Sequence, residues 1–231
     1  PLQEKEFFAV GEEQVVIKES GVFLHSPKPL KTISSAVYNA GIGWYKTFVN
    51  RIVNPEYEFN HVEKEVEQFL AGEQLEKTES VVMLTAIDPT TAIVKTYTQA
   101  ELSILIVVTA GVGNAIDASK AQLRNEKPYA GTINTWVIIN GNLTNEAFVQ
   151  AMITATEAKS KALQEEQIFD TVSETIATGT GTDSLLIAAT QTGSSYQYAG
   201  PLTALGQLIG YSVCDATRKA IQNYKQKSEI K

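Results

Sequence analysis

Five consecutive large aliphatic residues, Ile104 to Val108, stand in the middle of this chain. The run is far too short to cross a bilayer, which takes about 20 apolar residues in a helix. A strand whose successive residues are all apolar is buried on both faces of its sheet, because neighbouring side chains point to opposite sides. The run therefore predicts a central strand in a sheet that is covered on both sides.

The rest of the chain predicts more strands than helices. Apolar and polar positions alternate between residues 14 and 54, which indicates antiparallel strands joined by turns. Further strands are predicted over residues 80–87, 91–98, 102–109, 133–139 and 184–189. Helices are predicted over residues 61–70, 144–163 and 202–224, with a frayed tail over 225–231. The predicted inward face of the second helix is rich in alanine, from Ala147 to Ala162, and that of the third runs from Leu205 to Ala220. The predicted fold class is α+β: a mixed, largely antiparallel sheet or sheets with long helices packed in layers as an α/β sandwich, in one domain over residues 1–231.

The amino-acid composition limits the classes of binding partner and of metal site that we expect. The net charge is −7 and the pI is about 5.0, which argues against nucleic acid and against an anionic membrane surface. Cys214 is the one cysteine, and His25 and His61 are the two histidines, so we expect no disulfide and no metal site rich in cysteine or histidine. We assign no metal ligands, although carboxylates could still hold a metal. We expect a cytoplasmic protein without membrane insertion, and a homo-oligomer stays possible.

Three short segments combine glycine with hydroxyl or amide side chains beside a predicted strand. They are Thr109–Ala115 (TAGVGNA), Gly131–Asn134 (GTIN) and Ala177–Asp183 (ATGTGTD). A turn exposes catalytic groups while the adjoining strand fixes their position. Three such turns in one chain predict a shared site. The sequence lacks a phosphate-binding Gly-Lys-Ser/Thr loop and a nucleophile-elbow serine.

These segments also carry a resemblance to a known family. TAGVGNA, AGTIN, a helix capped by Asn-Leu-Thr, ATGTGTDS and Tyr198–Gly210 (YAGPLTALGQLIG) follow one another in the order seen in the adenosylcobinamide amidohydrolase family. The similarity covers roughly residues 80–220. It implies hydrolysis of the amide that joins aminopropanol to the corrin ring of adenosylcobinamide, giving adenosylcobyric acid in corrinoid salvage for cobalamin synthesis. It implies a corrinoid substrate and no separate cofactor, since the substrate itself carries cobalt.

The resemblance departs from the family pattern at one point. After Ala199 and Gly200 the family usually has Thr-His-Thr, whereas this chain has Pro201, Leu202 and Thr203. A histidine that could move a proton is replaced by leucine. Two alternatives to the hydrolase therefore stay open: a corrinoid-binding protein without activity, and an amidohydrolase that acts on another amide.

Thr132 is the first candidate nucleophile. It follows Gly131 at the start of a predicted strand, and glycine permits a close approach of the backbone. This layout is loosely similar to that of self-processing aminopeptidases, whose nucleophile is a serine or threonine after glycine. The similarity would predict cleavage between Gly131 and Thr132, which frees an α-amine with a pKa of about 8 that suits a general base.

The competing mechanism leaves the chain intact. Asp183 would activate a water molecule, while Asn114 and the backbone amides of Gly111 and Gly113 would hold the oxyanion. Each of these groups also has an ordinary structural explanation. Asp183 in a turn can accept backbone N–H groups, and Asn114 can cap a tight turn.

The remaining candidates would bind the substrate. In an extended segment Thr178, Thr180 and Thr182 point to one face and could donate to the amides around the corrin, although strand threonines are also common without any such role. Tyr129, Trp136, Tyr196 and Tyr198 are candidates for an apolar floor or for the core. The full set of predicted substrate-binding residues is Thr109, Gly111, Gly113, Gly131, Asn134, Thr178, Thr180, Thr182, Tyr198 and Gly200.

Overall fold

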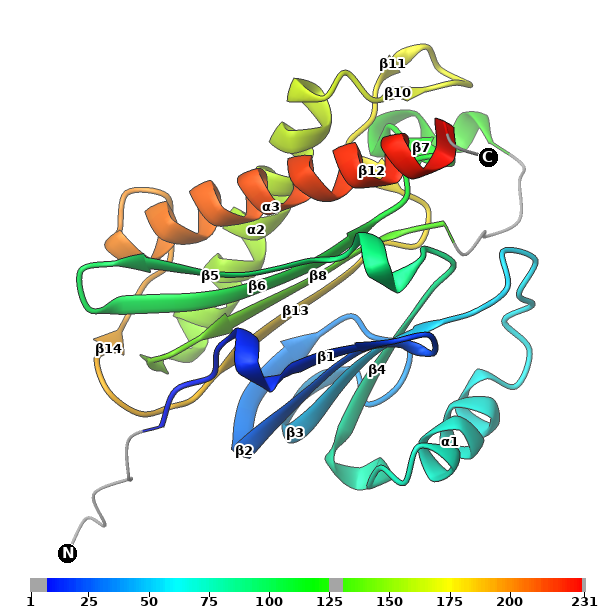
Figure 1. Ribbon diagram of the computed structural model, residues 1–231. Coiled ribbons are helices and arrows are strands. Elements are labelled where there is room, and N and C mark those ends of the chain that lie inside the picture. The colour runs from blue at the N-terminus through cyan, green and yellow to red at the C-terminus, as the bar shows by residue number, and fades with distance from the viewer. Residues whose placement is uncertain (1–7, 125–130, 230–231) are drawn as a thin grey trace, which may run out of the picture.

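The computed structural model describes residues 8–124 and 131–229, and its main element is an eight-stranded sheet (Figure 1). In spatial order the strands are β4 (Ser80–Thr85), β3 (Gly41–Ile52), β2 (Gly21–Ser34), β13 (Ser184–Ala189), β8 (Ile133–Ile139), β6 (Leu102–Ala110) and β5 (Ile93–Gln99). The eighth strand, β1 (Val15–Lys18), pairs with β2. Most neighbours are antiparallel, whereas β3–β4 and β8–β13 are parallel. The predicted α+β class with a mixed, largely antiparallel sheet is confirmed.

Three helices and three small two-stranded sheets complete the described chain. The helices are α1 (Val62–Gly72), α2 (Asn145–Glu165) and α3 (Ala204–Glu229). The small sheets pair β7 (Ala115–Ile116) with β12 (Gly179–Thr180), β9 (Asn142–Leu143) with β14 (Ser195–Tyr196), and β10 (Phe169–Asp170) with β11 (Thr175–Ile176). Short 3₁₀ turns cover Glu12–Gln14, Lys77–Glu79, Pro89–Thr91 and Ala118–Leu123.

The strand predicted from the aliphatic run is β6, and it is buried on both faces. It lies between β8 and the edge strand β5 rather than at the middle of the sheet. Its burial comes from the layers above and below. Ile104, Ile106 and Val108 pack towards α2 and α3, whereas Leu105 and Val107 pack towards the other half of the sheet.

The sheet bends over on itself because β2 is long and irregular. Its pairing with β3 shifts register between His25 and Leu30, in a stretch that holds Pro27 and Pro29, which cannot donate to the ladder. Beyond the shift, residues 31–34 pair with β13. The half built from β1–β4 thus lies against the half built from β13, β8, β6 and β5 (Figure 1).

Three groups of buried residues define four layers. The first group lies between helices α2 and α3 and the upper half of the sheet, which is built from β13, β8, β6 and β5. The second group lies between the two halves. The third group lies between the lower half, built from β1–β4, and α1. In the second group Trp136 of β8 donates its Nε1–H to Sδ of Met83 on β4, at 3.4 Å. The order of layers is helix, sheet, sheet, helix (Figure 1).

The predicted helix faces are confirmed. The Thr144 side chain accepts the N–H of Ala147 and caps α2, whose buried face is rich in alanine. The helix near the C-terminus runs on to Glu229, so the prediction of a frayed tail after Tyr224 is wrong for residues 225–229. Lys225 donates to the backbone oxygen of Glu166 and Lys227 contacts Asp88, and these contacts tie the last turns to the body.

Over residues 8–124 and 131–229, none of the helices combines the length and the apolar character that a membrane span needs. The expectation of a single domain over residues 1–231 stays a prediction.

Candidate active site

The three glycine-bearing turns meet at one edge of the upper half of the sheet, where its strands begin or end. β6 is antiparallel to β8, and β8 is parallel to β13. The carboxyl end of β6 therefore lies beside the amino ends of β8 and β13. The small β7–β12 sheet joins the first turn to the third, with Ala115 opposite Thr180. The convergence predicted from the sequence is present.

Thr132 lies in a buried polar network between the two halves of the sheet. Its hydroxyl donates to the backbone oxygen of Thr182 at 2.8 Å and to Oδ1 of Asn134 at 3.3 Å. Asn134 donates to Asn50, which in turn donates to the Thr109 hydroxyl, both at 2.7 Å. Thr132 is 1% exposed, and Asn134, Asn50 and Thr109 are equally enclosed. The network therefore joins four of the predicted residues, Thr132, Thr182, Asn134 and Thr109, through hydrogen bonds that fix the turns.

Asp183 joins the third turn to β8 and α2. Oδ1 accepts the N–H of Ile133 at 2.9 Å and the hydroxyl of Thr180 at 2.6 Å, and Oδ2 accepts the N–H of Thr180 at 3.1 Å. Oδ2 also accepts a hydrogen bond from Nζ of Lys159 at 2.5 Å. Two carboxylate oxygens offer about four lone-pair sites, so these four donors occupy the carboxylate. Asp183 is thus a turn carboxylate, as one interpretation of the sequence held, and also one half of an ion pair.

Lys159 is a residue that the sequence reasoning missed. It leaves α2 on the side that faces the start of β13, and its side chain is only 16% exposed. Gly179 makes room for the pair, because a Cβ at that position would lie 2.4 Å from Oδ2 of Asp183 and 2.7 Å from Nζ of Lys159. One signal was present in the sequence: a lysine directly after Ala158, beside an alanine-rich face that packs on a sheet.

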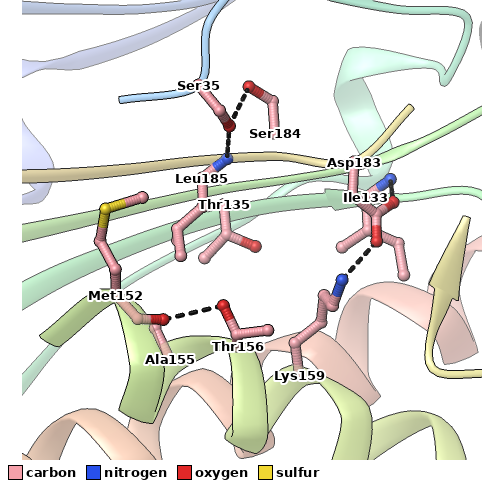
Figure 2. Close-up of a pocket in the computed structure, with 10 residues that line it drawn as sticks. All are labelled: Ser35, Ile133, Thr135, Met152, Ala155, Thr156, Lys159, Asp183, Ser184 and Leu185. Atoms are coloured by element: carbon pink, nitrogen blue, oxygen red, sulfur yellow. Dashed lines mark hydrogen bonds and ion pairs between the residues drawn. The ribbon is translucent and has the colours of Figure 1, made fainter. Parts of the chain in front are cut away.

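The ion pair lies in a cavity of about 200 Å³ between α2 and the starts of β8 and β13. Figure 2 shows Lys159, Met152 and Thr156 rising from α2 toward Thr135 and Leu185 of the sheet. Ser35, after the end of β2, and Ser184 lie at its other side, with their hydroxyl oxygens 3.3 Å apart. The lining residues are Ser35, Ile133, Thr135, Met152, Ala155, Thr156, Lys159, Asp183, Ser184 and Leu185.

Thr135 stands out among the lining residues. It is 2% exposed, and its hydroxyl has no hydrogen-bond partner among the residues that the structure describes. The other side chains on this face of β8 are aliphatic: Ile133, Val137 and Ile139. A buried hydroxyl without a partner is costly, so its presence in an aliphatic row calls for an explanation.

The predicted oxyanion donors are only partly available. The N–H of Gly111 donates to the backbone oxygen of Thr132 at 3.0 Å, which takes it out of the proposed role. Gly113 is exposed. Oδ1 of Asn114 is buried and has no hydrogen-bond partner in the described part of the chain. Asn114 directly precedes β7, so it lies at the sheet edge where the three turns meet.

Asp170 holds the segment that follows Asn114. Its Oδ1 accepts a hydrogen bond from Nη2 of Arg124 at 2.6 Å, and its Oδ2 accepts the N–H of Asp117 at 3.0 Å. Burial opposes ionisation of this carboxyl, but the Arg124 guanidinium and three backbone N–H groups outweigh it and keep the pKa of Asp170 well below its usual value. The charged form is therefore the form that the fold stabilises.

The threonines of the third turn do not form an open row of donors. The extended segment β12 ends at Thr180, and a turn follows at Gly181 and Thr182. The Thr180 hydroxyl donates to Asp183, and the Thr178 hydroxyl accepts the N–H of Ala118. Thr178 and Thr180 thus stabilise the turn itself, while Gly131 is buried beside Thr132.

The structure does not bring Tyr198 and Gly200 to this edge. β14, which ends at Tyr196, pairs with β9 beyond the carboxyl end of β8, at the far end of the sheet from the β7–β12 pair (Figure 1). Leu202 lies in the same region and is 94% exposed, so the departure from the family pattern falls outside the cavity lining.

The expected aromatic floor has a different composition. Trp136 is 1% exposed and belongs to the core, and Tyr129 lies outside the described residues. Instead, Ile42 and Trp44 of β3 are 73% and 51% exposed. Ile42 pairs with Ile33, two residues before Ser35 at the cavity.

These two apolar side chains lie on the α2 side of the sheet. Trp44 pairs with Lys31, and Nζ of Lys31 hydrogen-bonds to Oδ1 of Asn145 on α2. Cross-strand partners share a face, and so do residues two apart in a strand. An exposed apolar shelf, Ile42 and Trp44, therefore leads towards the cavity on this face.

The cysteine and the histidines have ordinary surroundings. Burial raises the pKa of the Cys214 thiol, which disfavours the reactive thiolate. Nδ1 of His25 lies 3.1 Å from the Thr47 hydroxyl, and His61 precedes α1. Among the described residues, no group of three or more histidine, cysteine or acidic side chains is arranged to hold a metal ion.

Comparison with known proteins identifies relatives of this chain. A family model described as adenosylcobinamide amidohydrolase matches residues 7–229, which includes the N-terminal strands that carried no motif. The uncharacterized protein MJ1613 of Methanocaldococcus jannaschii is 40% identical over 106 residues, 46% of this chain and 40% of that protein. The uncharacterized ABC transporter ATP-binding protein YvrA of Bacillus subtilis is 24% identical over 209 residues, 88% of this chain and 37% of that protein. This chain thus spans about two fifths of the length of either relative.

Among solved structures, the PH0078 protein from Pyrococcus horikoshii OT3 is similar with a TM-score of 0.45 and 8% sequence identity. The alignment covers 96% of this chain and 81% of that one.

Proposed function

The chain belongs to the adenosylcobinamide amidohydrolase family, and from this premise we propose that it hydrolyses the amide between aminopropanol and the corrin ring of adenosylcobinamide. The products would be adenosylcobyric acid and aminopropanol, and the reaction would serve corrinoid salvage for cobalamin synthesis. The cobalt would enter with the substrate, and no separate cofactor is proposed. The observation that carries the proposal is the family match over residues 7–229.

The cavity beside Asp183 supports the same reaction. Amide hydrolysis needs a base for the attacking water, a proton for the leaving nitrogen and donors for the oxyanion. An ion pair of carboxylate and ammonium at 2.5 Å in a small cavity supplies one group of each charge. We assign the amide to this cavity, with Asp183 as the group that takes the proton of water.

Thr132 is the alternative nucleophile, and its surroundings favour the water route. Thr132 is 1% exposed, and its hydroxyl donates to the backbone oxygen of Thr182. A wide corrinoid has no access to a hydroxyl in this position. Attack by Thr132 would therefore need the chain to open, as cleavage after Gly131 would do.

The exposed shelf of Ile42 and Trp44 supports a flat, largely apolar ligand. Pockets for such ligands pair apolar walls with a few polar groups. The corrin ring would rest on the shelf, while one side chain with its amide enters the cavity at Ser35. Hydrolysis is favoured over binding without turnover because Leu202, the residue that raised the second alternative, lies outside the cavity lining.

The test is incubation of the purified protein with adenosylcobinamide, with aminopropanol and adenosylcobyric acid measured by mass spectrometry. We expect both products in equal amounts, and expect Asp183→Asn to abolish turnover while spectroscopic binding of the corrinoid is retained. A complete cobamide and a simple peptide serve as comparison substrates. Tight binding without any product would reject hydrolysis in favour of a corrinoid-binding protein, and release from another amide alone would reject this substrate.

A further inference from the structure

Lys159 carries more donors than its ion pair uses. An ammonium group has three N–H donors. One goes to Oδ2 of Asp183, and no other acceptor is hydrogen-bonded to Nζ within the described ranges 8–124 and 131–229. The side chain lines the cavity and is 16% exposed, so the remaining donors are partly shielded from water.

Thr135 provides a second donor in the same cavity. Its hydroxyl is buried and has no partner in the described part of the chain, although valine would fit the aliphatic row of β8 equally well. Figure 2 places its oxygen on the side of the cavity where Lys159 lies. A ligand oxygen that enters the cavity would give this donor its hydrogen-bond partner.

We propose that Lys159 and Thr135 bind the carbonyl oxygen of the scissile amide and stabilise the negative charge that develops on it. The inference rests on the proposed hydrolase function and names two catalytic residues for it. It also replaces the oxyanion donors expected from the sequence, since the N–H of Gly111 is already bonded to Thr132.

The step balances with the groups in the cavity. The oxygen of water bonds to the carbonyl carbon, and the π electron pair moves onto the carbonyl oxygen, which accepts from Lys159 and Thr135. As Lys159 turns to the substrate, a lone pair of Oδ2 is freed on Asp183 and takes the proton of water. The C–N bond then breaks, Asp183 returns the proton to the leaving nitrogen, and a carboxylic acid and an amine remain.

The test compares matched variants by steady-state kinetics on adenosylcobinamide. Thr135→Val keeps the shape and removes the hydroxyl, and we expect kcat to fall about 100-fold with KM little changed. Thr135→Ser keeps the hydroxyl and should retain most of the activity. Lys159→Met should lower kcat by about 100- to 1,000-fold. The control is Thr217→Val, because the Thr217 hydroxyl is also buried without a hydrogen-bond partner in the described part of the chain but lies outside the cavity lining.

Thermal melts establish that each variant is folded, and Thr135→Ser preserves the test where Thr135→Val does not fold. Equal kcat values for Thr135→Val and Thr217→Val, or full activity of Lys159→Met, would overturn this inference while the hydrolase function stands. Absence of aminopropanol release by the wild-type protein would instead overturn the proposed function, and this inference with it.

Discussion

Replacement of Gly179 by alanine tests the ion pair without changing either charged residue. The added Cβ would lie 2.4 Å from Oδ2 of Asp183 and 2.7 Å from Nζ of Lys159, and van der Waals contact begins at about 3.4 Å. Both charged groups cannot keep their positions. Asp183 is held by Ile133 and Thr180, so the longer Lys159 side chain is the one that we expect to move.

The cost follows from this displacement. Inserting one carbon into a packed site costs about 1–3 kcal/mol, and a hydrogen bond to a charged group is worth about 1.5–3 kcal/mol. When Lys159 moves away, the clash is relieved but its hydrogen bond to Asp183 is lost, so only one of these two costs applies. We therefore expect the free energy of unfolding to fall by about 1–3 kcal/mol, and each kcal/mol lowers Tm by about 2–4 °C for a chain of this size. Moving Lys159 from the cavity should also lower kcat about 100-fold, as loss of one oxyanion donor does.

Gly181→Ala is the matched control in the same turn. Its Cβ would lie 3.2 Å from Cδ1 of Ile116, the end of a side chain that can yield, and Gly181 is exposed. We expect a change within about 0.5 kcal/mol and nearly normal turnover.

A double-mutant cycle decides whether the clash is with the ion pair. If Lys159 is the group displaced, Gly179→Ala should cost much less activity in a Lys159→Met background than in the wild type. Additive effects of the two changes, or wild-type kcat in Gly179→Ala, would refute the reasoning.

Three further predictions concern other parts of the molecule. Asp170→Ala should lower the free energy of unfolding by about 3–5 kcal/mol, because it leaves Arg124 without its buried carboxylate. Since the pKa of Asp170 is lowered in the fold, the difference from wild type in thermal melts should be full above about pH 4 and should shrink as the pH falls further. The intact mass of active protein should be that of one uncleaved chain, and two fragments that separate before Thr132 would instead support self-processing. Trp44→Ala should raise KM for adenosylcobinamide several-fold with kcat nearly unchanged, and an unchanged KM would remove the shelf from the substrate site.

Much of the fold follows from local patterns in the sequence. The strand over 184–189 and the alanine face of α2 were predicted because their periodicity depends only on near neighbours along the chain. The doubling of the sheet was not predicted. It depends on the register shift in β2 between His25 and Leu30, and such a shift is set by pairing with strands far away in the sequence.

The same contrast holds at the site. The meeting of the three turns could be inferred because each adjoins a strand, and strand ends gather at a sheet edge. The roles of single side chains could not be inferred from the sequence. Thr132 and Asn134 point between the two halves of the sheet, whereas Thr135 faces the cavity. Which of these side chains reaches the cavity depends on which face of the sheet α2 covers.

The position of α2 explains why a lysine, which a sequence pattern assigns to solvent, belongs to this site. Ala155 and Ala158 are buried against the sheet, and side chains this small let a helix approach closely. Lys159, next in sequence to Ala158, then begins near enough to β13 for its ammonium to reach Asp183. Gly179 removes the one Cβ that would stand between them. The alanine face, the glycine of the third turn and the ion pair are therefore parts of one arrangement.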